Sequence, residues 1–145
     1  AHVMRVTVKG LGDDRICREA GKAIVNSPLV KTAVYGNDPN VGRLLAALGD
    51  FLGNQGQRLD ANRLTVSLCG HVVFDRGVFQ LSAETEAALS NALRQARQDP
   101  TVQGYPQHDR FVDIECALSS GAGAARVLGS DLGYEYVKEN ADYRS

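Results

Sequence analysis

The residues best suited to chemistry lie in one short turn. Asn37, Asp38 and Asn40 stand close together, and Arg43 follows them. Their amide, carboxylate and guanidinium groups include donors and acceptors, which a small polar ligand needs. The sequence therefore indicates a candidate site in this turn, either for a ligand or for contact with another part of the protein.

The segments that flank the turn also allow an ordinary structural interpretation. Residues 29–35 are apolar and rich in β-branched side chains, which favours a buried strand, and a helix is expected from Val41. A strand–turn–helix unit directs free backbone N–H groups toward an anionic ligand above the end of the strand. It is equally the usual connection between two elements, in which Asp38 or Asn40 caps the helix and Arg43 pairs with an acid.

No residue in the sequence stands out as a catalytic nucleophile or as part of a metal site. No serine has the flanking glycines of a nucleophile elbow, and no HExxH motif is present. The cysteines and histidines are scattered and lack the spacing of metal ligands; they are Cys17, Cys69, Cys116, His2, His71 and His108. We therefore expect free buried thiols in a reducing compartment and no metal site.

Two further groups of residues have alternative interpretations. Gly121 and Gly123 follow an expected strand, which weakly resembles a phosphate-binding loop, but the third glycine of a dinucleotide fingerprint is missing. Asp113 and Glu115 alternate along one strand and are either paired catalytic acids or part of an exposed strand face. A nucleotide-binding domain is thus a third functional hypothesis, which predicts thermal stabilisation by nucleotides.

Length and charge narrow the classes of protein. The chain has 145 residues, the size of one domain, so residues 1–145 are treated as a single domain. The formal net charge of −1 gives no electrostatic reason to expect binding to nucleic acid or to an anionic membrane. No apolar run approaches the roughly 20 residues of a membrane span. We expect a cytoplasmic protein.

The order of the expected elements predicts an α/β fold. Alternation of apolar and polar residues predicts strands, one hairpin included, and glycine-rich stretches predict loops. Strands are expected over residues 4–8, 29–35, 64–68, 71–74, 112–118 and 126–128. Helices are expected over residues 13–26, 83–98 and 131–140, and a further helix is expected to begin at residue 41. Loops are expected over residues 49–62 and 101–109. Alternating strands and helices with a hairpin favour an α/β sandwich with a mixed sheet.

Two stretches at opposite ends of the chain resemble one family. Residues 26–43 are similar to the motif NSPLVKTA..G.DPNWGR, and residues 129–145 are similar to GCDLTYDYVRINADYR(S/T). Both motifs are typical of the bifunctional glutamate/ornithine N-acetyltransferases of arginine biosynthesis, the ArgJ family. The resemblance covers essentially the whole chain but only the final third of the family enzyme. It implies a DmpA/ArgJ-like mixed-sheet sandwich, of which this chain is the C-terminal region only, within the beta chain.

The resemblance implies a reaction and also what this chain lacks. Family members are multifunctional acyltransferases that move an acetyl group from N-acetylornithine to glutamate through an acetyl-threonine intermediate. The threonine is an N-terminal nucleophile released by autocatalytic cleavage, and its motif lies upstream of the region matched here. The isolated chain is therefore expected to be inactive. The implied partners are the nucleophile-bearing region and an alpha chain, in a heterotetramer. No cofactor is expected, although some members use acetyl-CoA as the acetyl donor.

The resemblance also assigns residues to substrate binding. The family ending supplies an asparagine amide and a terminal hydroxyl, here Asn140 and Ser145, which hold the amino-acid end of ornithine or glutamate. Without the resemblance, Asn140 would be read as the frayed end of a helix and Ser145 as a chain terminus.

Three positions depart from the family motifs. Val41 replaces a tryptophan, Ser130 a cysteine and Gly133 a threonine. These differences leave open a divergent member, a paralogue with another acyl acceptor, or an inactive relative. The alternative from another class is a non-catalytic α/β domain of the same fold that binds an anion or a partner protein.

Overall fold

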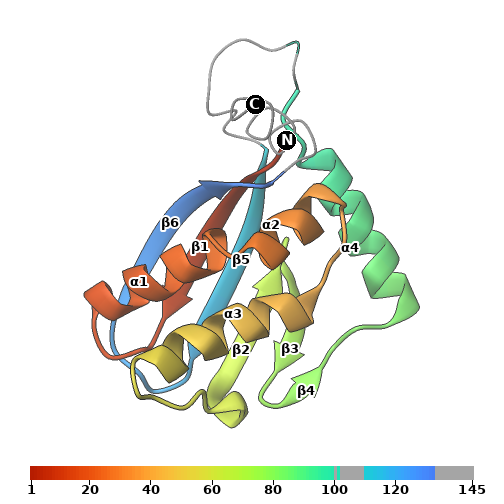
Figure 1. Cartoon of the computed structure of the whole chain (residues 1–145). Helices are drawn as coiled ribbons and strands as arrows, with labels where there is room; N and C mark the ends of the chain where they lie inside the picture. Colours follow the sequence, from red (N-terminus) through yellow and green to blue (C-terminus); the bar gives the residue numbers. More distant parts are fainter. Residues whose placement is uncertain (100, 102–109, 133–145) are drawn as a thin grey trace.

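The computed structural model describes residues 1–99, 101 and 110–132. Its strands form one sheet of six strands in the order β4-β3-β2-β5-β1-β6 (Figure 1). The strands are β1 (Val3–Lys9), β2 (Leu64–Leu68), β3 (His71–Asp75), β4 (Val78–Phe79), β5 (Phe111–Leu118) and β6 (Ala124–Ser130). β1 and β5 run parallel, whereas the other neighbouring strands are antiparallel, so the sheet is mixed as predicted.

Helices cover one face of this sheet. They are α1 (Asp14–Val25), α2 (Pro28–Tyr35), α3 (Val41–Asn54) and α4 (Ala83–Gln95), with a short 3-10 helix, η1 (Ala61–Arg63). In the view of Figure 1, α1 and α3 lie side by side in front of the strands, and α4 lies beyond the end of α2. No helix among the described residues is long and apolar enough to cross a membrane.

The core lies between the sheet and the helices. Met4, Val6 and Val8 of β1 point to the helical side and are fully buried, because successive strand residues face opposite sides of the sheet. Leu48 and Leu52 continue the apolar stripe of α3 onto the same core.

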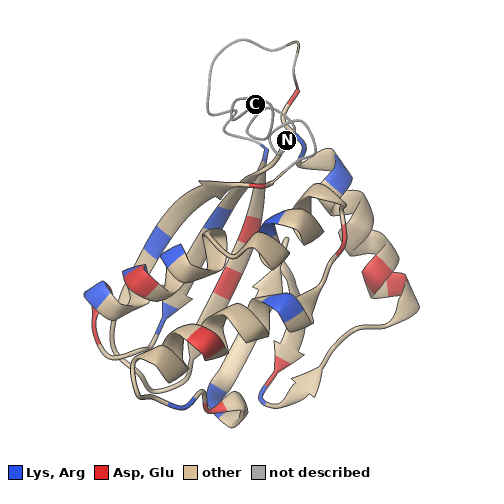
Figure 2. Ribbon diagram, viewed as in Figure 1, with Lys and Arg blue, Asp and Glu red and all other residues tan. Residues whose placement is uncertain are grey.

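The other face of the sheet carries charged residues in ion pairs. Asp113 of β5 accepts two hydrogen bonds from Arg5 of the neighbouring β1, at 2.5 and 3.0 Å, and Lys9 lies 3.0 Å from Glu115. Asp113 and Glu115 therefore belong to an exposed strand face, which was the structural alternative in the sequence. Figure 2 shows that the two signs of charge are interspersed over the molecule.

The predicted strand at residues 29–35 is wrong, because this segment forms α2. Ser27 is the N-cap, and its hydroxyl accepts a hydrogen bond from the Val30 amide, while Pro28 occupies the first helical position. Val30, Ala33 and Val34 are buried, which is the i, i+3, i+4 spacing of a helix. A short run of apolar residues satisfies both patterns, so this segment alone does not distinguish a strand from a helix.

Several predicted boundaries also differ from the structure. The loop expected from residue 49 is helical as far as Asn54, because the burial of Leu48 and Leu52 compensates for Gly49 and Gly53 in the helix. α4 ends at Gln95, and β6 is longer than the predicted strand because it pairs with β1 along its whole length. The short β4 was not predicted. The helix predicted over residues 131–140 falls largely outside the described residues, as does the loop over residues 101–109.

The expected starts of the helices near residues 13 and 83 and the expected hairpin are confirmed. Asp13 and Ser82 are the N-caps of α1 and α4, through hydrogen bonds from the amides of Ile16 and Thr85. The predicted hairpin joins β2 to β3 through Cys69 and Gly70, both with positive φ. Positive φ at both central residues matches the right-handed twist of the paired strands.

Candidate functional site

The turn between α2 and α3 is held in one conformation by its own backbone. Asn37 has a φ of 56°, a conformation that asparagine tolerates better than most residues. The Asn37 amide donates to Val34 O at 3.0 Å, and the Asp38 amide donates to Ala33 O at 2.9 Å. Asn40 then caps α3, because its side-chain oxygen accepts from the Arg43 amide at 3.1 Å. Of the two predicted caps, Asn40 is therefore the one used.

Arg43 does not pair with an acid, which was the structural alternative predicted for it. Its Nη1 donates to the Leu29 carbonyl at 2.9 Å and to Thr32 Oγ1 at 3.3 Å, and no acidic partner is found for it among the described residues. Arg43 therefore ties the start of α3 to α2. Asn40 and Arg43 thus fix the start of α3, whereas Asn37 and Asp38 line a cleft beside the turn.

A cleft of about 510 Å³ opens between this turn and α4. Its charged lining includes the carboxylates of Asp38 and Glu86 and the guanidinium of Arg94, and Ser90 adds a hydroxyl. The remaining lining residues are Gly36, Asn37, Pro39, Ala83 and Ala87. A cleft with both signs of charge suits a ligand that has both an ammonium and a carboxylate group.

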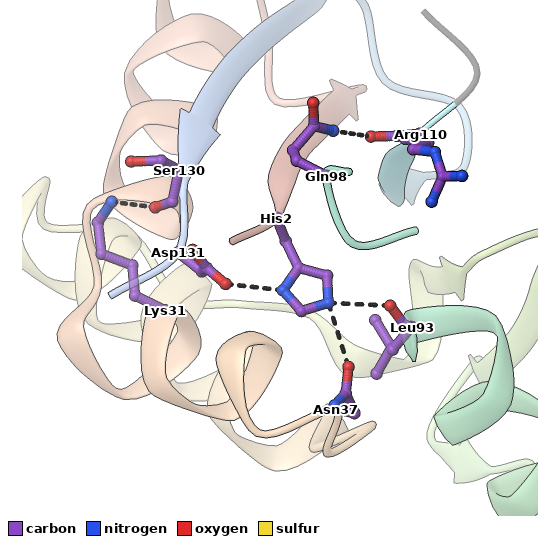
Figure 3. A network of polar contacts seen from close by, with 8 residues as sticks. All are labelled: His2, Lys31, Asn37, Leu93, Gln98, Arg110, Ser130 and Asp131. Atoms are coloured by element: carbon purple, nitrogen blue, oxygen red, sulfur yellow. Dashed lines mark hydrogen bonds and ion pairs between the residues drawn. The ribbon is translucent and has the colours of Figure 1, made fainter. Parts of the chain in front are cut away.

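A buried histidine lies behind the cleft. His2, at the start of β1, is 1% exposed, and its ring contacts three segments that are distant in the sequence (Figure 3). Nδ1 lies 2.7 Å from Asp131 Oδ2, while Nε2 lies 2.9 Å from the carbonyl oxygen of Leu93 and 3.1 Å from Asn37 Oδ1. Together with Asp131, Asn37 and Leu93, it forms what we call the His2 network.

The electrostatics of this network favour an ionised Asp131. Burial favours the neutral acid, but the hydrogen bonds from the His2 ring and from the His2 backbone, together with the charge of His2, hold the pKa of Asp131 below its usual value. The carboxylate is therefore available as a charged acceptor for the ring.

Backbone contacts join the same segments. The Asp131 amide donates to the His2 carbonyl at 3.2 Å, and Lys31 Nζ donates to the carbonyl of Ser130 (Figure 3). The Gln98 amide donates to the carbonyl of Ala1 at 2.7 Å. The start of β1, the end of β6, α2 and the residues after α4 thus meet at one end of the sheet.

The sequence drew attention to only part of this site. Asn37 and Asp38 were predicted as candidate site residues, whereas His2, Asp131, Ser90 and Arg94 were not. Each contact of the His2 ring spans a large separation along the chain, so no local pattern could have indicated it. The two predicted substrate-binding residues, Asn140 and Ser145, lie outside the described residues.

Two of the thiols, those of Cys69 and Cys116, are not activated for nucleophilic chemistry. Burial, with the nearby Asp113 charge, raises the pKa of Cys69 to about 11, and burial raises the pKa of Cys116 to about 12. Both thiols are free and remain protonated at neutral pH. Over the part of the chain that the structure describes, no three His, Cys, Asp or Glu side chains converge in a way that could hold a metal ion.

The glycine-rich loop after β5 has a packing role. A Cβ atom on Gly121 would lie 1.9 Å from the carbonyl oxygen of Gly10, and one on Gly123 would lie 2.4 Å from the backbone of Asp13. The strand β6 follows this loop directly, whereas a dinucleotide fingerprint requires a helix there. The predicted resemblance to a phosphate-binding loop is therefore wrong in its structural context.

The fold and the site together define a class of protein. It is an α/β protein with a mixed sheet, helices on one face in its described part, and a polar cleft bounded by a helix–helix turn and a second helix. Convergent polar groups in a concave site make this cleft a candidate for binding a small molecule.

Comparison with known proteins gives the family. The sequence profile of the ArgJ family matches residues 1–145, so this chain belongs to the ArgJ family. A crystal structure of the arginine biosynthesis bifunctional protein ArgJ from Bacillus halodurans is similar over 99% of this chain, with a TM-score of 0.76 and 29% identity. This agreement confirms the predicted fold class.

The relatives are longer than this chain. The arginine biosynthesis bifunctional protein ArgJ of Thermosynechococcus vestitus is 37% identical over 141 residues, which are 97% of this chain and 32% of the relative. The protein of the same name from Wolinella succinogenes is 36% identical, over 95% of this chain and 30% of the relative. The chain thus spans about a third of these curated relatives and 58% of the Bacillus halodurans chain.

Proposed function

We propose that this chain is a region of an acetyltransferase that moves an acetyl group from N-acetylornithine to glutamate through an acetyl-threonine intermediate. The observation that carries the proposal is the match of the ArgJ family over all 145 residues. The reactive threonine comes from another region, released by autocatalytic cleavage, and the assembly is a heterotetramer with an alpha chain. N-acetylornithine and glutamate are the substrates, and acetyl-CoA is an additional candidate donor.

The charged cleft supports a role in holding an amino acid. Ornithine and glutamate share an α-ammonium and an α-carboxylate group, and N-acetylornithine keeps a side-chain ammonium. Arg94 offers a donor pair to a carboxylate, while Asp38 and Glu86 offer acceptors to an ammonium group. In this proposal, Asn140 and Ser145 also bind the amino-acid end of the substrate. The face of the sheet that the helices leave uncovered contacts the rest of the enzyme.

The test uses the full product of the open reading frame that contains these residues. N-acetylornithine labelled with ¹³C in the acetyl group is mixed with glutamate, and labelled N-acetylglutamate is followed by NMR. We expect transfer, together with a threonine-containing peptide that gains the mass of one acetyl group when glutamate is omitted. The isolated 145-residue chain should transfer no acetyl group. A full product that carries the cleaved threonine but shows no transfer would contradict the proposal.

The cleft is tested with a matched pair of arginine variants. Arg94→Gln removes the cationic group that lines the cleft, and we expect the KM for both amino-acid substrates to rise about tenfold because ground-state binding is lost. Arg15→Gln removes the same charge from an exposed position on α1 and should leave KM unchanged. Equal effects of the two substitutions would argue against an amino-acid site in the cleft.

A further inference from the structure

The His2 ring joins the two walls of the cleft. One wall is the α2–α3 turn, which contributes Asn37, and the other is α4, on which Leu93 lies directly before Arg94. Nε2 of the ring lies within hydrogen-bonding distance of both walls, at 3.1 Å from Asn37 Oδ1 and 2.9 Å from the Leu93 carbonyl oxygen (Figure 3). The position of this ring therefore sets the separation of the walls at the back of the cleft.

The contacts determine how many protons the ring carries. A backbone carbonyl can only accept, so Nε2 must carry a proton to bond with Leu93. Nδ1 faces the carboxylate of Asp131 at 2.7 Å, and an ionised carboxylate also only accepts. Both nitrogens are therefore donors, and the ring is an imidazolium that pairs with Asp131.

The burial of this pair suggests a role in geometry rather than in stability. The side chains of His2 and Asp131 are 0% and 2% exposed, so both charges have been removed from water. Such pairs contribute little net stability, because the cost of desolvation offsets the attraction between the charges. A buried ion pair does fix the direction and length of its hydrogen bonds, because displacing one partner leaves the other charge buried and unpaired, which is energetically costly.

We propose that His2 is a positioning residue, held as an imidazolium by Asp131, that braces the α2–α3 turn against α4 and so fixes the width of the amino-acid cleft. The inference deepens the proposed function and rests on it for the identity of the substrate. His2 itself does not reach the lining of the cleft, so it acts through Asn37 and through α4.

The first test concerns the protonation of the ring and requires no activity. The ¹⁵N spectrum of the full gene product, with His2 assigned through a His2→Gln variant, should show two protonated ring nitrogens at neutral pH. Asp131→Asn preserves the size of the partner but removes its charge, and it should convert His2 to a neutral ring. A neutral tautomer of His2 in the unmodified protein would overturn the proposal, even if acetyl transfer is observed.

The second test separates positioning from stability. Asp131→Asn should raise the KM for N-acetylornithine and glutamate about tenfold with a smaller change in kcat, when assayed well below its melting temperature. Glu19→Gln removes a carboxylate from an exposed ion pair on α1 and should leave KM unchanged. An Asp131→Asn protein that is folded but has an unaltered KM would refute the positioning role of His2.

A third variant covers the case in which Asp131→Asn does not fold. Asn37→Gly keeps the positive φ of the turn, which glycine adopts freely, and removes only the side chain that His2 contacts. We expect a folded protein with a raised KM for both substrates, whereas an unchanged KM would refute the positioning role of His2. If the unmodified product transfers no acetyl group, the proposed function fails, and the ¹⁵N spectrum still decides the state of His2.

Discussion

The close contact between the glycine-rich loop and the loop after β1 makes Gly121→Ala a sharp test of the fold. The new Cβ would lie 1.9 Å from Gly10 O, a distance below 3.0 Å that such contacts essentially never show, so the loops must separate by more than 1 Å. This movement would weaken the hydrogen bonds from the Gly10 amide to Gly123 O, at 2.9 Å, and from the Gly12 amide to Ala122 O, at 2.8 Å.

The expected loss of stability combines the weakened hydrogen bonds, the overpacking and the change in the entropy of the unfolded chain. Two backbone hydrogen bonds contribute about 1 kcal/mol each, and overpacking of backbone against backbone costs about 1–3 kcal/mol. The lower entropy of alanine in the unfolded chain returns about 0.5–1 kcal/mol. We therefore expect the free energy of unfolding to fall by about 3 kcal/mol and the melting temperature by about 10 °C.

Urea and thermal unfolding measure this change, and Gly49→Ala is the matched control. Gly49 lies inside α3, and no surrounding atom lies within 4 Å of the position that an alanine Cβ would take, so alanine there should stabilise the protein by about 1 kcal/mol. If Gly121→Ala lies within about 1 kcal/mol of the unmodified protein, the close approach of the two loops is wrong. Stabilisation of the unmodified protein by nucleotides would instead revive the phosphate-binding interpretation of this loop.

Three further predictions concern single residues. The lowered pKa of Asp131 means that its contribution to stability is present above about pH 4 and is lost as the pH falls through its folded-state pKa. Asp131→Asn should therefore flatten the acid limb of a plot of unfolding free energy against pH, and an unchanged limb would contradict this. The pKa of Cys116, raised from 9.0 to about 12, implies stability that is present below about pH 9 and is lost as the pH rises further, about 1 kcal/mol by pH 10. Cys116→Ala should remove this alkaline loss, and retention of the full loss would show that another group causes it. Asn40→Ala removes the cap of α3 and should cost about 1 kcal/mol in urea unfolding, whereas Asn40→Asp should cost much less; equal losses would exclude capping as the cause.

Much of the sheet could be predicted from local patterns. The alternation in β1, β2 and β5 identified these strands, since burial on one face imposes a period of two residues. Capping residues such as Asp13 and Ser82 accept hydrogen bonds from amides only three positions away, so the starts of helices can also be predicted from short segments of sequence.

The predicted strand at residues 29–35 shows where local patterns fail. Its residues satisfy the preferences of a strand and of a helix at the same time, and the choice depends on what they pack against. The cap at Ser27 with Pro28 at the first helical position was the available signal, but the same Pro28 also suits the end of the preceding helix. Similarly, only packing against the core keeps α3 helical through Gly49 and Gly53.

The sequence by itself determined the family resemblance, the alternation of the sheet and the polar turn with Asn37 and Asp38. Only the tertiary structure decided that this turn faces α4 across a cleft and that His2 and Asp131 meet behind it. The physical reason is that a pattern along the chain reports how neighbouring residues share a face, whereas the contacts of the His2 ring join residues brought together by strand order and helix packing.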